Sequence, residues 1–373
     1  MIKAIELKGF KCFKDKTCIP LRTVTVLYGK NGRGKSSVAQ SVLLLAQTMR
    51  KNNSLDYLIL NDGYVNQGYF DELVNKDSEQ KSFEIELESE FGESVKVVYE
   101  RMNDRPQLGM LVSQIVNGKE TFEEMSASND VSAHEDDAQT LSAGVTSDIA
   151  ILQGLKDTMY VSADRIGPVN DAQYTYPQKD VPLSPTGKNI INLIAEQNAG
   201  FVADLERNLS NVLSGASLSI EYTQDKIELG LNSSDGSSTM RPINVGFGYS
   251  YVLPVIVAAM LAKPGCLVIV ENPEAHLHPG AQSRLANFLI TQSEKKKFQL
   301  ILETHSDHVI NGLRIAAKNG SINFSDTIIL HFSHAEDSVR PVIQEIRCDK
   351  NGNLSDYPDD FMDEWTKQLL KLV

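Results

Sequence analysis

The sequence predicts an α/β fold with a mostly parallel core sheet, an antiparallel β subsheet and a helical lobe. Continuous apolar runs at Val24–Tyr28, Cys266–Val270 and Thr327–Leu330 alternate with segments of helical spacing, as in a parallel sheet that is buried on both faces. A glycine-rich loop joins the first of these runs to an apolar helix over Val38–Met49. Ser82–Val98 instead alternates polar and apolar residues in short strands, which predicts the antiparallel subsheet.

The other elements follow from the same two periodicities. Ile2–Leu7 predicts an opening strand, and Met159–Ser162 predicts a strand that returns to the core. A stripe of large apolar residues predicts a helix over Ile190–Leu213, within the helical lobe. Beyond the central apolar run, Gln282–Ser293 predicts a helix and Gln299–Leu302 the next strand.

The composition is that of an ordinary globular protein. The 373 residues are 41% hydrophobic and 23% charged, which allows a substantial core. The N-terminus lacks the basic start and apolar run of a signal peptide. The longest apolar stretch, Val252–Ala262, contains Pro254 and is too short to cross a bilayer. The four cysteines show no paired metal spacing and are interpreted as reduced thiols, so a cytoplasmic protein without membrane contact is expected.

The net charge limits the possible partners. A formal charge of −13 argues against wholesale binding of nucleic acid, because phosphate contacts need clustered Lys and Arg. Two basic runs, Lys295–Lys297 and the set Lys11, Lys14 and Lys16, are interpreted as solvated faces. A local basic face stays compatible with this overall charge.

The glycine-rich loop has the spacing of a phosphate-binding loop. Its pattern is Gly-x-x-x-x-Gly-Lys-Ser, between a predicted strand and a predicted helix. The glycines let successive backbone N–H groups turn toward an anion at the helix N-terminus, where the lysine reaches phosphates and the serine binds Mg²⁺. ATP and Mg²⁺ are therefore the expected cofactors. The nucleotide-binding residues predicted from the loop are Gly29, Lys30, Asn31, Gly32, Arg33, Gly34, Lys35, Ser36 and Ser37.

Acidic and histidine residues follow two of the predicted strands. Glu271 ends one buried strand and opens the stretch to Pro279, while Thr304–Ser306 ends the next strand. Ligands bind outside the carboxyl ends of strands in open α/β sheets, so both segments are site candidates. Zinc binding by His276 and His278 is not favoured, because no Cys or third His accompanies them.

These motifs together resemble those of one group of ATPases. The phosphate loop, the stretch Glu271–Pro279 and Thr304–Ser306 are similar to a bacterial branch of ABC-type ATPases. That branch includes RecF-like proteins, SMC-like proteins and the ATPase portion of OLD-family (overcoming lysogenization defect) proteins. Gly246–Ser250, just before a helix expected from Val252, resembles the signature motif of the branch, and the likeness covers roughly residues 1–75 and 240–335. Ser162–Pro168 also looks like a family segment, with no role assigned.

The resemblance implies a role for each matching residue. Lys35 would hold phosphate, Glu271 would be the Walker B acid, and His305 would be the switch histidine that bonds the γ-phosphate. The implied Mg²⁺ ligands are Ser36, Gln67 and Glu271, with Gln67 as the Q-loop glutamine, and the implied trans contacts to a second subunit are Gly246, Gly248 and Ser250.

The sequence departs from the family pattern at two positions. The Walker B acid is usually Asp followed by a catalytic Glu, but here Asn272 follows Glu271, and an amide cannot act as a general base. Glu274 is the nearest alternative and is the predicted base or water-orienting residue. Tyr251 stands where the signature often has Gln or Glu, which changes the trans contact.

The likeness also divides the chain into segments. Lys119–Asp148 is rich in Ser, Ala, Asp, Glu and Thr and is interpreted as an exposed, flexible insertion. The last segment is interpreted as a solvated cap that ends in a helix over Phe361–Leu370. The predicted divisions are the N-terminal half of the ATPase head at 1–118, the insertion at 119–148, a helical and β lobe at 149–245, the C-terminal half of the head at 246–335, and the cap at 336–373.

The expected function is ATP binding and hydrolysis to ADP and phosphate. The resemblance implies a homodimer or higher oligomer that forms head-to-tail on ATP and signals to a separate effector protein, in phage defence or DNA maintenance. Two alternatives stay open: a nucleotide-gated sensor or scaffold with negligible turnover, and a RecF-like DNA-repair ATPase. No sustained heptads separate the phosphate loop from Glu271, so coiled-coil arms are not expected, nor is a Toprim nuclease domain.

Overall fold

The computed structural model describes residues 1–123, 149–173, 182–233, 238–334 and 340–372. The chain forms two compact units, one from residues 1–21, 31–158 and 333–342, the other from residues 22–30, 159–332 and 343–373. The division falls inside the phosphate loop, between Lys30 and Asn31. In the part of the chain that is described, no helix combines the length and apolar character needed to span a bilayer.

The first unit is built on an antiparallel sheet with the strand order β2-β1-β5-β6-β7-β4, and β8 pairs with β7. The strands are β1 (Ile2–Lys8), β2 (Thr17–Pro20), β4 (Tyr57–Ile59), β5 (Ser82–Ser89), β6 (Ser94–Arg101), β7 (Leu108–Val116) and β8 (Lys119–Glu123). In β5 every second residue is buried, as its alternating sequence predicts. Helices α1 (Lys35–Asn52) and α2 (Ala150–Lys156) pack against each other in this unit.

The core sheet has the order β16-β15-β3-β14-β13-β9. Strands β15, β3, β14, β13 and β9 are parallel to their neighbours along that order, and all residues of β3 and β14 are buried. The strands are β3 (Val24–Gly29), β9 (Met159–Val161), β13 (Leu267–Glu271), β14 (Gln299–Thr304), β15 (Thr327–His334) and β16 (Pro341–Ile346). The sheet confirms the predicted α/β class with a parallel core.

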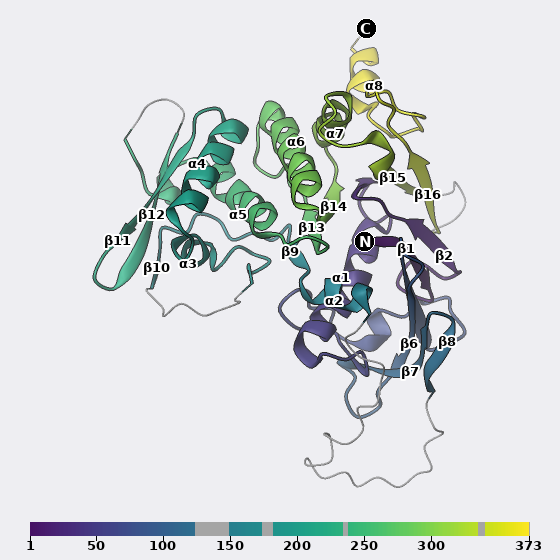
Figure 1. Ribbon diagram of the computed structural model, residues 1–373. Helices are drawn as coiled ribbons and strands as arrows, with labels where there is room; N and C mark the ends of the chain where they lie inside the picture. Colours follow the sequence, from purple (N-terminus) through teal and green to yellow (C-terminus); the bar gives the residue numbers. More distant parts are fainter. Residues whose placement is uncertain (124–148, 174–181, 234–237, 335–339, 373) are drawn as a thin grey trace. The chain divides into compact units, whose positions relative to one another are not determined.

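Helices and a small sheet complete the second unit. Figure 1 shows α4, α5 and α6 side by side, with α7 next to α6. The small sheet has the order β10-β12-β11. The bounds are α3 (Ile190–Ala195), α4 (Ala199–Leu213), α5 (Phe247–Leu261), α6 (Pro279–Lys296), α7 (Asp307–Lys318), α8 (Glu364–Leu370), β10 (Asp171–Gln173), β11 (Ser217–Tyr222) and β12 (Lys226–Asn232).

The start of the predicted polar insertion is a strand. Lys119–Glu123 forms β8, which pairs with β7 across a turn at Asn117 and Gly118, both with positive φ. Asn-Gly is the preferred dipeptide of two-residue hairpin turns, so the sequence does carry a signal for this hairpin. Lys119 and Glu120 are exposed, as expected, but these five residues form a strand of the antiparallel sheet instead of part of an insertion without regular structure, and residues 124–148 lie outside the described part of the chain.

Three helix boundaries also differ from the expectations. The single helix expected over Ile190–Leu213 is two helices, because the Asn198 side chain accepts a hydrogen bond from the Phe201 N–H at 2.9 Å and caps α4. The signature motif forms the first turn of α5 rather than preceding the helix. The last helix begins at Glu364 instead of Phe361, since Asp360 and Met362 adopt positive φ.

Candidate functional site

The core sheet brings the ends of three predicted site segments to one edge. Strands β3, β14 and β13 are adjacent and parallel, and Thr304 on β14 lies opposite Tyr28 on β3. Glu271 on β13 lies opposite Glu303 on β14. The phosphate loop starts at Gly29, the last residue of β3. The loop, the Walker B segment (Glu271–Pro279) and the switch segment (Thr304–Ser306) therefore all leave the sheet at its carboxyl edge.

Within the first unit, the rest of the phosphate loop leads directly into α1. Gly34 is the N-cap of α1 with a φ of 99°, and no side chain caps the helix. Lys35 and Ser36 occupy the first turn, where backbone N–H groups lack intrahelical partners and the helix dipole favours an anion. Cys12 lies so close to the Gly34 Cα that a Cβ there would come within 2.9 Å of its sulfur. The close approach of Cys12 and the positive φ therefore both favour glycine at position 34.

Lys11 is a residue that sequence reasoning missed. It was interpreted as part of a solvated basic run, but its side chain is half-buried and its ammonium donates to Gln67 Oε1 at 2.5 Å. The same ammonium donates to the side-chain oxygen of Gln40 on α1. Lys11 thus links the predicted Q-loop glutamine to the helix of the phosphate loop. No spacing in one sequence distinguishes Lys11 from its solvated neighbours, because the link exists only after folding.

The ionisation of Lys11 gives a testable pH dependence. Burial lowers the pKa of the Lys11 amine from 10.5 to about 8, against the opposing effects of Cys12 and Glu72. Between these two pH values the native state binds fewer protons than the unfolded chain, so this group makes the free energy of unfolding rise with pH. We expect urea denaturation at pH 8 and pH 10 to show a larger rise for the wild type than for Lys11→Met. Equal rises would show that Lys11 titrates normally.

Glu271 sits in a partly closed environment at the end of β13. One carboxylate oxygen accepts a hydrogen bond from the Ala163 N–H at 3.2 Å, and the Tyr160 hydroxyl also bonds the carboxylate. Burial raises the pKa of Glu271. Its neighbour Asn272 has a φ of 43°, and its buried Oδ1 has no hydrogen-bond partner among the described residues. The carboxylate and this amide oxygen are therefore candidate ligand groups at this edge.

Glu274 reaches across to the switch segment. Its Oε1 accepts a hydrogen bond from the backbone N–H of His305 at 2.9 Å. Its other carboxylate oxygen is buried without a hydrogen-bond partner in the described ranges. The fold thus joins the two residues that the sequence analysis assigned to water and to γ-phosphate, although they are far apart in sequence.

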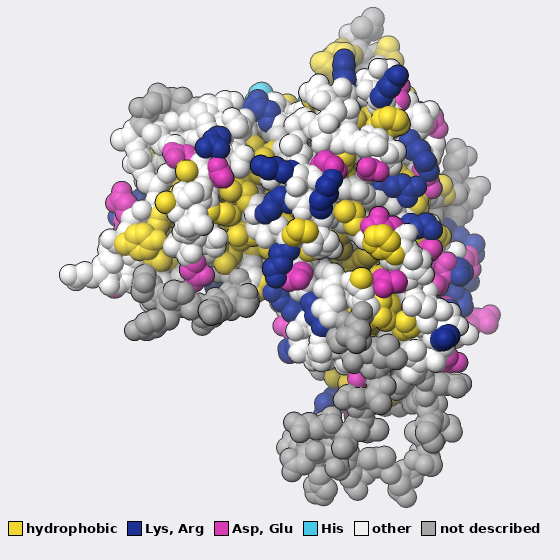
Figure 2. Space-filling model, viewed as in Figure 1, with side chains coloured by type: hydrophobic (Ala, Val, Ile, Leu, Met, Phe, Trp, Pro, Cys, Tyr) yellow, Lys and Arg dark blue, Asp and Glu magenta, His cyan; other side chains and the backbone are white. Residues whose placement is uncertain are grey.

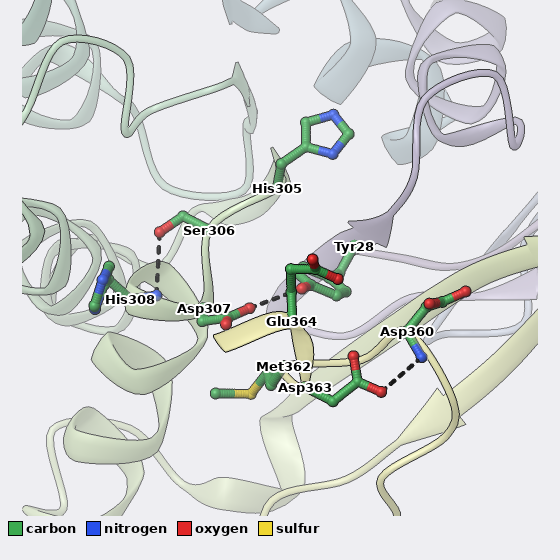
Figure 3. Close-up of a pocket in the computed structure, with 9 residues that line it drawn as sticks. All are labelled: Tyr28, His305, Ser306, Asp307, His308, Asp360, Met362, Asp363 and Glu364. Carbon is green, nitrogen blue, oxygen red and sulfur yellow. Dashed lines mark hydrogen bonds between the residues drawn. The ribbon is translucent and has the colours of Figure 1, made fainter. Parts of the chain in front are cut away.

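The switch segment also lines a cavity of about 270 Å³ (Figure 3). The Tyr28 hydroxyl donates to Asp307 Oδ1 at 2.7 Å on its wall. Four carboxylates make this cavity unsuitable for phosphate, and in Figure 3 the imidazole of His305 points away from them. The lining residues are Tyr28, His305, Ser306, Asp307, His308, Asp360, Met362, Asp363 and Glu364.

The signature segment packs against the turn that follows Glu271. A Cβ on Gly248 would come within 2.6 Å of the His276 carbonyl oxygen, so only glycine permits this approach. Gly246 is exposed, and the Ser250 hydroxyl is buried with no hydrogen-bond partner in the part of the chain described. The His276 ring lies 4.4 Å from the Tyr251 ring, centroid to centroid, and His278 caps α6. Among the described residues, no three or more His, Cys, Asp or Glu side chains are arranged so that they could together hold a metal ion.

Comparison with known proteins gives two family matches. Residues 24–311 match the family described as "AAA domain, putative AbiEii toxin, Type IV TA system". Residues 322–372 match the family described as "Protein of unknown function (DUF3696)". A curated relative, the DNA replication and repair protein RecF of Acetivibrio thermocellus, is 28% identical over 117 residues, which are 31% of this chain and 30% of that protein.

The solved structures show the same fold at low sequence identity. An SMC head bound to the C-winged helix domain of ScpA has a TM-score of 0.52 and 16% identity, covering 93% of this chain and 98% of the other. An SMC head with an extended coiled coil, bound to the C-terminal domain of ScpA derived from Pyrococcus furiosus, has a TM-score of 0.50 and 14% identity. It covers 100% of this chain and 99% of that chain. These structures are P-loop ATPase folds, as the sequence analysis expected.

Proposed function

This chain belongs to the AAA-domain family matched over residues 24–311 and is an ABC-type ATPase of the SMC-like and RecF-like branch, and we propose its function from there. We propose that it hydrolyses ATP and signals to a partner protein. The observation that carries the proposal is the hydrogen bond between Glu274 and the His305 N–H. It joins two segments that leave adjacent strands at the sheet edge where the phosphate loop begins.

The residues present fit ATP and Mg²⁺. Ser36, Gln67 and Glu271 offer hydroxyl, amide and carboxylate oxygens, and hard oxygen donors are what Mg²⁺ prefers. The ammonium of Lys35 and the N–H groups at the start of α1 suit the phosphates. Bound Mg²⁺ would neutralise charge on the phosphate oxygens.

Glu274 is the proposed base or water-orienting residue. Asn272 cannot accept a proton, and Glu274 has one carboxylate oxygen fixed by the His305 N–H and a second without a partner among the described residues. That second oxygen is suited to hold a water molecule. His305 would then bond the γ-phosphate, so the same hydrogen bond would align water and phosphate.

The site is proposed to be completed by a second copy of the chain. Gly246, Gly248 and Ser250 would contact the γ-phosphate bound to the other subunit, and the exposure of Gly246 at the start of α5 supports this role, whereas the buried Ser250 hydroxyl would have to turn outward first. The two SMC heads of similar fold were solved with domains of ScpA bound, which supports a separate effector as partner. A role in phage defence or DNA maintenance is part of the same proposal.

Glu274→Gln is expected to lower the ATPase rate about 100-fold or more, since removal of a general base has effects of that size. ATP binding should persist, so light scattering should show the mass of Glu274→Gln double when ATP is added. Lys35→Ala is the matched control, because it should lose both turnover and the ATP-dependent dimer. Equal ATPase rates in the wild type and both variants would contradict the proposal.

Asn272 favours a second candidate function, a nucleotide-gated sensor with negligible turnover. Tight ATP binding and a stable ATP-bound dimer in the wild type, without phosphate release, would favour it over the enzyme. A RecF-like repair role would instead require DNA binding that weakens with salt. On the face in Figure 2, Lys and Arg side chains lie among Asp and Glu side chains, in keeping with the net charge of −13.

A further inference from the structure

Arg165 is a buried charge in the segment Ser162–Pro168, for which the function proposed above has no use. The residue is 4% exposed, and its hydrogen bonds within the described residues all go to backbone carbonyls. One guanidinium nitrogen, Nη1, donates to the carbonyls of Ser162 at 3.0 Å and Glu271 at 2.8 Å. The other, Nη2, donates to the Asn272 carbonyl at 2.6 Å.

If Arg165 served only to fill space, burying its charge would cost desolvation free energy without a return. Burial lowers the pKa of Arg165, and its buried Nε has no partner among the described residues. An apolar side chain would fill the space without that desolvation cost. Only a planar guanidinium, however, can donate in parallel to two successive carbonyls, and hydrogen bonds from a charged donor are stronger than neutral ones.

The two carbonyls belong to a turn that needs such support. Asn272 has a φ of 43° and His276 a φ of 61°, both in the left-handed region that non-glycine residues rarely adopt. Residues held in that region depend on surrounding contacts. Glu274 lies between these two positions and bonds the His305 N–H. The orientation of Glu274 therefore depends on the turn that Arg165 holds.

Arg165 also contacts the signature helix, α5. Its guanidinium carbon lies 5.7 Å from the centre of the Tyr251 ring on α5, a cation–π contact. The Tyr251 ring in turn packs on His276 of the turn, at 4.4 Å between ring centroids. Gly248 on the same helix lies against the His276 carbonyl. Arg165, Tyr251 and the turn thus form one continuous set of contacts.

We propose that Arg165 is a positioning residue that holds the turn after Glu271 and, through Tyr251, couples the placement of Glu274 to the signature helix. When the signature motif of one subunit contacts the other subunit, this coupling would change the position of Glu274, the proposed base, in the subunit that carries the motif. This inference rests on the proposed function only in the role given to Glu274. The hydrogen bonds of Arg165 to the carbonyls of Glu271 and Asn272, called the clamp below, do not depend on the proposed function.

The first test is hydrogen exchange in nucleotide-free protein. In Arg165→Lys the charge is kept, but a single ammonium nitrogen replaces the two nitrogens that bond the Glu271 and Asn272 carbonyls, so the hydrogen-bonded amides of Asn272, Ala275 and Leu277 should exchange about 10-fold to 100-fold faster. Asp164→Asn, an exposed neighbour, is the control and should leave that exchange unchanged. Unchanged exchange in Arg165→Lys would overturn the clamp, whether or not the protein hydrolyses ATP.

The second test addresses the coupling. Tyr251→Ala removes the ring that contacts Arg165, whereas Tyr251→Phe keeps it and should retain both turn protection and turnover. We expect Tyr251→Ala to lower kcat about 10-fold with little change in KM, and to add little further loss in the Arg165→Lys background. Additive losses in the double variant would overturn the coupling. A wild type without ATPase activity would count against the proposed function instead, and the exchange result would still decide the clamp.

Discussion

Gly29→Ala is expected to weaken ATP binding severely. The φ of Gly29 is 138°, and a Cβ at this position would come within 2.3 Å of the Phe332 backbone oxygen on the neighbouring strand β15. Non-glycine strain of this kind costs about 1–3 kcal/mol before any clash is counted. Because the obstacle is backbone in the core sheet, the loop must move instead. We expect the Kd of a fluorescent ATP analogue to weaken at least about 100-fold, equivalent to about 2.7 kcal/mol.

Gly32→Ala is the matched control within the same loop. Gly32 also has a positive φ, 73°, but a Cβ there would meet no atom within 4 Å. Its replacement adds backbone strain without a clash, at a cost of about 1 kcal/mol, so binding should weaken by roughly 10-fold or less. Equal losses of ATP affinity in the two variants would mean that backbone strain, and not the contact with β15, determines the conformation of the loop.

Of the variants proposed for this chain, Phe361→Ala is expected to lower the free energy of unfolding the most. Phe361 is 1% exposed, and its ring lies 5.1 Å from the Tyr28 ring and 5.6 Å from the His331 ring, centroid to centroid. Truncating a buried Phe costs about 3–5 kcal/mol. That is a large part of the roughly 5–15 kcal/mol that stabilises a typical domain. Urea denaturation followed by circular dichroism should show a clearly lower midpoint.

The C-terminal segment supplies its own control for this prediction. Leu370 on α8 is 73% exposed, so Leu370→Ala should change the free energy of unfolding by no more than about 0.5 kcal/mol. Because Tyr28 precedes the phosphate loop, Phe361→Ala should also weaken ATP binding, while Leu370→Ala should not. A normal midpoint for Phe361→Ala would show that the segment 360–364 is not anchored on Tyr28.

Local sequence patterns predicted the elements whose signal lies within a few residues. The apolar runs of β3, β13 and β14 and the spacing of the phosphate loop were sufficient to predict the parallel core. The Asn117-Gly118 turn carried an equally local signal, but the composition of the following residues concealed it. Helix ends were less predictable, since the starts of α4 and α8 depend on the single side chain of Asn198 and on single φ angles at Asp360 and Met362.

The sequence alone determined the fold class and the family, and it predicted the residues that are proposed to hold ATP and Mg²⁺. It could not reveal that Lys11 bonds Gln67, that Glu274 bonds the His305 N–H, or that Arg165 binds the carbonyls of Glu271 and Asn272. Those contacts join residues distant in sequence, and no local periodicity encodes them. The tertiary structure decided them, because strand order and register determine which chain ends meet at the edge of the sheet.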